Sequence, residues 1–162
     1  EFGEFNEIGI ARFKRILEQC EKYNIPVAVE NIDDPIAFRK VFELFSDNNY
    51  LKFCLDVGHK HCFEPETDFI KQYGNKLICL HLHSNMGDAD THTLNKYGNV
   101  NWNKVARDLS KLNTDNLNLD YELIIRNKVE ENAEECLKLC FAQAVELEEK
   151  ILSYKNKKNK KQ

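Results

Sequence analysis

Several features of secreted and membrane proteins are absent from this sequence. It has no N-terminal signal peptide and no long apolar run, so we expect no membrane span and a cytoplasmic location. Its six cysteines contain no Cys-x-x-Cys pair, and we expect reduced thiols that fill the core, not a disulfide framework. The sequence also begins at Glu1 without a methionine, which leads us to expect further residues upstream.

An excess of positive charge is absent as well. The 162 residues carry a formal net charge of -4, so no global field attracts nucleic acid or an anionic membrane, and we expect neither as a partner. The one basic run covers residues 155–162, and we expect it to be a solvated, disordered tail. Residues 1–154 have the length and composition of one globular domain.

Segments with the apolar pattern of a buried strand alternate along the chain with segments that have the apolar spacing of a helix. Four segments read as buried strands, namely residues 27–30, 51–57, 77–83 and 119–125. Helical patterns cover residues 7–23, a segment after Asp34-Pro35, residues 66–73, a segment from Asn101, and residues 129–154. This alternation predicts an α/β fold with a parallel sheet. Glu30 and Asp56 are 26 positions apart and Asp56 and His81 are 25 apart, close to one βα unit of a (β/α)8 barrel.

Residue parity along the strands separates an apolar face from a polar one. Side chains alternate between the two faces of a strand. One face is apolar throughout, and the other carries a small residue followed by an ionisable one in the first three strands. The ionisable side chains near the carboxyl ends of the four strands are Glu30, Asp56, His81 and Glu122.

Three carboxylates that converge without a cation would repel one another and lose solvation. Two Glu, one Asp and one His form a mixed oxygen and nitrogen set that suits Mn, Zn, Co or Mg, so we expect a divalent-metal site. The alternative is that each of the four is an ordinary buried polar residue with a local partner.

Several short segments resemble one superfamily, in its order along the chain. They are Val27-Ala28-Val29-Glu30-Asn31, Leu55-Asp56-Val57-Gly58-His59, Leu80-His81-Leu82-His83-Ser84-Asn85, Asp90-Thr91-His92, Gly98-Asn99-Val100-Asn101-Trp102 and Tyr121-Glu122-Leu123. The ordered set, over about residues 7–140, resembles the xylose-isomerase-like TIM-barrel superfamily, which includes sugar-phosphate isomerases, ketose 3-epimerases, inosose dehydratases and endonuclease IV. The match covers only the C-terminal half of that barrel, about four strands.

The resemblance implies that Glu30, Asp56, His81 and Glu122 bind the metal. It also implies an isomerase or epimerase of carbohydrate metabolism, acting on a sugar, sugar phosphate or related polyol through an enediolate. In this reading Glu30 and Glu122 are the catalytic acid and base. His59, Asp90 and His92 are candidates for a second metal or for substrate binding, since their equivalents bind further zinc ions in endonuclease IV.

We expect Asn31, His83 and Asn85 to contact the metal ligands without binding the metal themselves. The resemblance assigns His83 no role, and the alternative is that it is simply part of the polar lining of the site. The loop after His92 departs from the family, because Leu94-Asn95-Lys96-Tyr97-Gly98 has Lys96 where the first glycine of the usual loop stands. We expect the chain to require a missing N-terminal half or a second copy, since an isolated half barrel leaves two open sheet edges.

Two other functions remain open. One is an endonuclease IV-like phosphodiesterase acting on abasic DNA, against which the acidic charge argues. The other is a noncatalytic, metal-holding fragment of a larger barrel protein.

Overall fold

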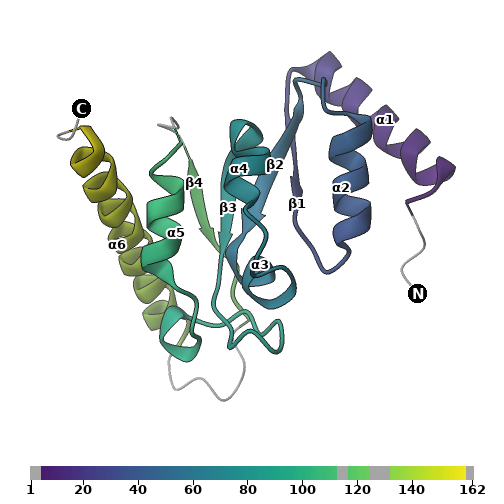
Figure 1. Ribbon diagram of the computed structural model, residues 1–162. Helices are drawn as coiled ribbons and strands as arrows, with labels where there is room; N and C mark the ends of the chain where they lie inside the picture. The colour runs from purple at the N-terminus through teal and green to yellow at the C-terminus, as the bar shows by residue number, and fades with distance from the viewer. Residues whose placement is uncertain (1–4, 113–116, 125–131, 160–162) are drawn as a thin grey trace.

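A single parallel sheet of four strands organises the molecule. The computed structural model describes residues 5–112, 117–124 and 132–159. The strands are β1 (Val27–Glu30), β2 (Leu51–Asp56), β3 (Leu77–Leu82) and β4 (Asn118–Tyr121). Their order in the sheet is β1-β2-β3-β4, the same as their order in the chain (Figure 1). The predicted parallel α/β fold is confirmed, and the strand order is that of an arc of a (β/α)8 barrel.

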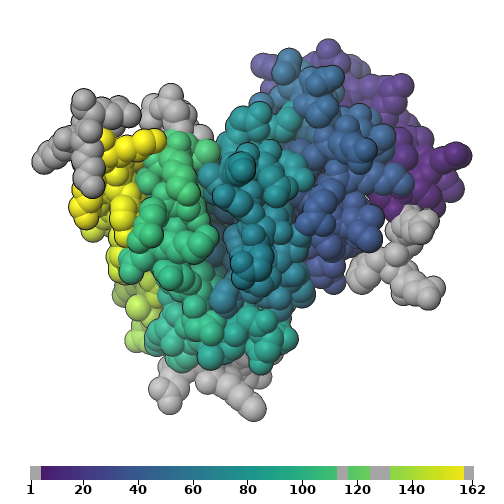
Figure 2. Space-filling model, viewed as in Figure 1, coloured from purple at the N-terminus to yellow at the C-terminus, as the bar shows by residue number. Residues whose placement is uncertain are grey.

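Helices connect the strands and cover one face of the sheet (Figure 1). Viewed from the same side with all atoms drawn, the segments follow one another across the molecule in chain order, from purple at the N-terminal end to yellow at the C-terminal end (Figure 2). They are α1 (Glu7–Tyr23), α2 (Pro35–Leu44), α3 (Val57–Phe63), α4 (Phe69–Tyr73), α5 (Trp102–Leu109) and α6 (Ala133–Asn159), with two short 3-10 turns, η1 (Gly74–Lys76) and η2 (Asn95–Tyr97). Helices α1 and α6 lie at opposite ends of the arc (Figure 1). None of the helices in this described part of the chain is long and apolar enough to cross a membrane.

Polar side chains set the start of several helices. Asn6 accepts hydrogen bonds from the backbone N–H groups of Ile8 and Gly9, at 3.0 and 3.2 Å. Asp34 accepts one from Ala37, at 3.0 Å, with a proline directly after the cap. These side chains satisfy N–H groups that have no partner within the first turn of a helix, and helices therefore begin there as predicted.

The β2–α3 boundary differs from the prediction. The second strand ends at Asp56, and Val57 begins α3, a helix that the sequence pattern did not indicate. The Asp56 side chain accepts a hydrogen bond from the backbone N–H of His59 at 2.6 Å, so it caps this helix. The next helix, α4, begins only at Phe69, because Asp68 caps it.

Other boundaries shift by a few residues. Strand β3 ends at Leu82, one residue earlier than expected, and β4 covers residues 118–121 where a strand over 119–125 was expected. Helix α6 begins at Ala133 and continues to Asn159, so residues 155–159 are helical where a disordered tail was expected. Residues 125, 129–131 and 160–162 lie outside the described part of the chain.

Aromatic side chains fill the layer between the sheet and the helices. Phe53 of β2 is completely buried, and its ring lies 5.5 Å from the ring of Phe38, 6.0 Å from Phe42 and 5.8 Å from Phe69. Large aromatic side chains bury much apolar area, and these contacts hold α2 and α4 against the strand.

The opposite face of the sheet carries the ionisable residues and is partly open. The side chains of Glu30 and His81 are 25% and 31% exposed. Cys54 and Cys79 lie opposite each other on β2 and β3. Burial, followed by the proximity of the two thiols, raises the pKa of Cys54, and burial also raises the pKa of Cys79, so both thiols stay neutral beside the carboxylates.

We expect Phe53→Ala to lower the free energy of unfolding by about 3–5 kcal/mol, because it leaves a cavity at the centre of the aromatic layer. Urea denaturation followed by circular dichroism measures this change. Ile36→Ala is the control, since the Ile36 side chain is 76% exposed on α2 and its loss should change stability by no more than about 0.5 kcal/mol. Equal losses in the two variants would contradict this description of the core.

Candidate metal centre

The carboxyl ends of the four strands bring the expected ligands together. Glu30 and Asp56 end β1 and β2, His81 lies on β3, and Glu122 directly follows β4. One ligand atom from each of the four lies within 4.8 Å of the others. Asp56 and His81 are direct partners in the parallel register, and the backbone N–H of Glu122 donates to the carbonyl of Leu82 at 3.1 Å.

Charged and polar atoms in this group approach closely without normal hydrogen bonds. Nδ1 of His81 lies 3.3 Å from Oε1 of Glu30 and 3.1 Å from Oε2 of Glu122. Both Nδ1 of His81 and Oε1 of Glu30 are nevertheless buried without a hydrogen-bond partner among the described residues, although Nδ1 of His59 lies 3.0 Å from the same Glu30 oxygen as an ion pair. A divalent cation would satisfy such atoms, and three carboxylates with one imidazole are donors that these ions accept. The residues therefore fit a bound divalent metal.

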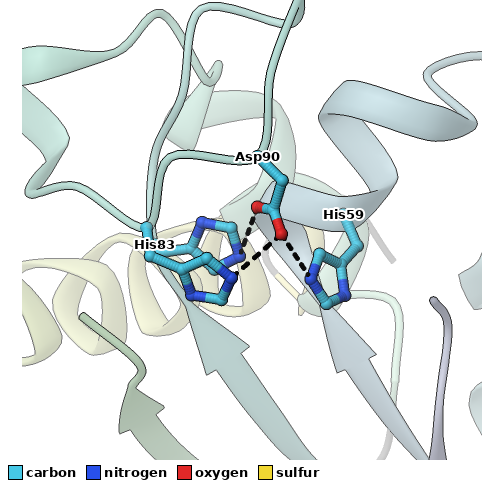
Figure 3. A group of neighbouring side chains, drawn as sticks. His59, His83 and Asp90 are labelled. Carbon is cyan, nitrogen blue, oxygen red and sulfur yellow. Dashed lines mark hydrogen bonds and ion pairs between the residues drawn. The ribbon is translucent and has the colours of Figure 1, made fainter. Parts of the chain in front are cut away.

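A second group of possible ligands lies beside the first and consists of His59, His83, Asp90 and His92. Again, one ligand atom from each lies within 4.8 Å of the others. Oδ2 of Asp90 is 3.1 Å from Nε2 of His59 and 3.0 Å from Nε2 of His92. Figure 3 shows Asp90 reaching from its loop to the rings of His59 and His83. The structure thus brings together His59, Asp90 and His92, the candidates for a second site.

A pair of backbone hydrogen bonds closes the loop between Ser84 and Thr93, which carries Asp90 and His92 of this second group. The N–H of Ser84 donates to the carbonyl of Thr93 at 2.7 Å, and the N–H of Thr93 donates to the carbonyl of Ser84 at 3.0 Å. His92 stands directly before this bridge with a φ of 46°, in the left-handed region that non-glycine residues seldom adopt. Its Nδ1 lies 3.1 Å from the carbonyl oxygen of Glu122, which ties the loop to the end of β4.

Electrostatics favour a charged His59 when no metal competes for it. Burial of the ring opposes the charged form, but the Glu30 carboxylate 3.0 Å from Nδ1 and the charges of Asp56 and Asp90 outweigh burial and raise the pKa of His59 to about 9. Burial likewise acts to raise the pKa of Glu30, but His59 and His81 outweigh it and lower this pKa overall. The Glu30 carboxylate is therefore ionised and available as a ligand.

The two asparagines near the site contact the backbone. Asn31 donates to the carbonyl of Asp56 at 3.0 Å and accepts from its N–H at 2.8 Å. Asn85 donates to the carbonyl of Gly58 at 2.9 Å. Both side chains are buried and hold the chain at the β2–α3 boundary, so they act on the position of the ligands and not on the ligand atoms.

The sequence reading did not anticipate the part that Gly58 plays. A Cβ at this position would lie 2.0 Å from Cε1 of His83, a distance that no real contact allows. Gly58 therefore makes the space in which the His83 ring sits. A glycine inside the segment Asp56-Val57-Gly58-His59 was the signal available in the sequence.

We expect the metal-free chain to lose stability between about pH 6.5 and pH 9. The pKa of His59 is about 9 in the folded chain and 6.5 ordinarily, so the contribution of the charged ring is complete below pH 6.5 and disappears as the pH rises through 9. The loss should be on the order of 2 kcal/mol. Urea unfolding in a chelator at both ends of this range measures it.

His59→Gln should remove most of this pH dependence. His61→Gln is the control, since His61 belongs to neither group and its Nε2 contacts an exposed Asn99. An unchanged pH response in the His59 variant would show that another group titrates.

Comparison with known proteins connects this geometry to a family. A crystal structure of a D-tagatose 3-epimerase-like protein shares the fold with a TM-score of 0.67 and 21% identity, over 91% of this chain and 54% of that chain. The uncharacterized protein MJ1614 of Methanocaldococcus jannaschii is 30% identical over 96 residues, which are 57% of this chain and 38% of that protein. The uncharacterized protein y4fM of Sinorhizobium fredii is 26% identical over 108 residues, or 62% of this chain and 34% of that protein.

The chain thus spans little more than a third of the length of these curated relatives and about half of the solved structure. The sequence profile described as xylose isomerase-like TIM barrel matches residues 6–142, which is most of the chain. The strand order, the helices on one face and this match agree, and the chain belongs to the xylose isomerase-like TIM barrel family.

Proposed function

We propose that the protein is a cytoplasmic, divalent-metal-dependent isomerase or epimerase acting on a sugar, a sugar phosphate or a related polyol. The observation that carries this proposal is the convergence of Glu30, Asp56, His81 and Glu122 at one end of a parallel sheet. The family and the D-tagatose 3-epimerase-like neighbour support the same class of reaction.

The positions of the two glutamates support a role in proton transfer. Both approach the same atom, Nδ1 of His81, and their side chains are 25% and 49% exposed on the open face of the sheet, where a substrate can enter. One carboxylate removes the proton from the carbon next to a carbonyl, and the other, in its acid form, returns a proton to the substrate. The pair regains its starting protonation by exchange with solvent.

Asp56 and His81 complete the ligand set. Asp56 is completely buried, so its role is to hold the ion and not to contact the substrate. A bound Mn, Zn, Co or Mg ion would polarise the substrate carbonyl and stabilise the negative charge that develops on its oxygen.

A second candidate is a phosphodiesterase similar to endonuclease IV. The group of His59, His83, Asp90 and His92 supports it, because a second set of ligands next to the first suits a site with several metal ions. The net charge of -4 argues against a nucleic-acid partner. A noncatalytic, metal-holding domain is the third reading.

We also propose that this half barrel works with another four-stranded half. Strands β1 and β4 lie at the edges of the described sheet, and α6 exposes the apolar side chains of Leu137 (70%) and Phe141 (73%). Pairing of the β1 and β4 edges with strands of the other half, and burial of Leu137 and Phe141 against it, would complete the barrel and enclose the open face of the sheet.

We expect Glu30→Gln and Glu122→Gln to lower proton exchange by about 10²–10⁴-fold, because each removes a group that transfers a proton in the reaction. The measurement is incorporation of solvent deuterium into a panel of ketoses by the intact, metal-loaded protein. Glu43→Gln, at an exposed position on α2, is the control and should exchange at the rate of the unaltered protein. Full exchange in either site variant would remove that glutamate from the reaction.

Metal analysis separates the candidates further. About one tightly bound ion per chain, lost in Asp56→Asn, is expected for the isomerase. Two or more ions per chain, together with cleavage of an abasic duplex, would favour the phosphodiesterase. Bound metal with neither activity in the intact protein would leave the metal-holding reading.

A further inference from the structure

His83 belongs to the second group of possible ligands and also contacts the first group, a contact that the proposed isomerase chemistry does not use. Its side chain is completely buried, and its Nε2 faces both oxygens of the Asp56 carboxylate, at 2.9 Å from Oδ1 and 3.1 Å from Oδ2. Carboxylate oxygens only accept hydrogen bonds, so Nε2 carries the hydrogen and donates it to Asp56. His83 Nδ1 is then the acceptor nitrogen of the ring, and it has no hydrogen-bond partner among the described residues.

The pocket around His83 is specific for a flat ring. Gly58 leaves room that any side chain would fill, since a Cβ there would lie 2.0 Å from Cε1 of His83. The His92 ring stacks on His83 with 3.9 Å between centroids and an interplanar angle of 13°. Both contacts restrict the orientation of the His83 ring.

We propose that His83 is a positioning residue that fixes the Asp56 carboxylate for metal binding. This inference rests on the proposed metal site at Glu30, Asp56, His81 and Glu122. The backbone N–H of His59 also binds Asp56, at Oδ1, but at a point set by the start of α3. Nε2 of His83 lies within hydrogen-bond distance of both oxygens, whereas Nδ1 of His59 is 3.8 Å from Oδ2, so His83 sets the rotation of the carboxylate plane and hence the direction of the lone pairs left for the ion.

A purely structural role predicts a different outcome. If His83 only filled the core, an apolar side chain of similar volume would preserve metal binding in the folded chain. If it positions Asp56, that substitution frees the carboxylate to rotate and leaves it buried with one contact fewer. The affinity for metal and the coordination geometry would then both change.

The test uses Co²⁺ as the probe, because its visible absorption reports coordination geometry. We expect His83→Leu to weaken Co²⁺ binding by about 10–100-fold in calorimetric titration, as for other residues that orient metal ligands, and to alter the spectrum. His83→Gln, whose amide can donate from a similar position, should restore affinity to within about tenfold and recover the spectrum. His61→Gln, outside both groups, should match the unaltered chain.

A double-mutant cycle at Gly58 keeps the test decisive if His83→Leu does not fold. Gly58 lies in helix α3, so the backbone there accepts alanine. The added Cβ would clash with the His83 ring. Gly58→Ala alone should weaken Co²⁺ binding, whereas in a His83→Ala background the same change should have little further effect.

The outcomes are distinguishable. Absence of Co²⁺ binding by the unaltered chain would overturn the proposed metal site and this inference together. Normal binding by the unaltered chain, with unchanged affinity and spectrum in folded His83→Leu or Gly58→Ala, would overturn the role of His83 alone.

Discussion

A buried negative charge shapes the centre of this molecule. The Asp56 side chain is completely excluded from solvent, and an ionised carboxylate in such a place is costly unless donors surround it. The start of α3 supplies the N–H of His59, the end of β3 supplies His83, and Asn31 pairs with the backbone on either side of the carboxylate. The turn from strand to helix, the glycine within it and the adjacent His83 ring all lie around this carboxylate and together supply its donors.

The sequence was sufficient to predict the sheet and the convergence of Glu30, Asp56, His81 and Glu122, because both depend on local periodicity. Alternation along each strand placed Glu30, Asp56 and His81 on one face, and parallel pairing then brought them to one end. Helices with polar caps, such as α2 after Asp34, could be predicted for the same reason. That these residues bind metal is still a prediction.

Other features depended on contacts between distant segments. Helix α3 is short and contains Gly58 and two histidines, so it has no clear apolar stripe to recognise. A backbone bridge between Ser84 and Thr93 brings the second group of possible ligands together, and no periodic pattern in the sequence predicts this bridge. The position of His83 between Asp56 and His92 likewise required the fold, since its neighbours come from three different segments.

The distribution of the expected ligands has a consequence for how such proteins can diversify. All four come from consecutive βα units of one half, and each stands at or just after the end of a strand. The loops that would close over a substrate from the other side of a complete barrel belong to different units. Reaction chemistry and substrate choice would then be separable modules, so exchange of one half could change what is recognised while the ion and its acid-base pair stay as they are.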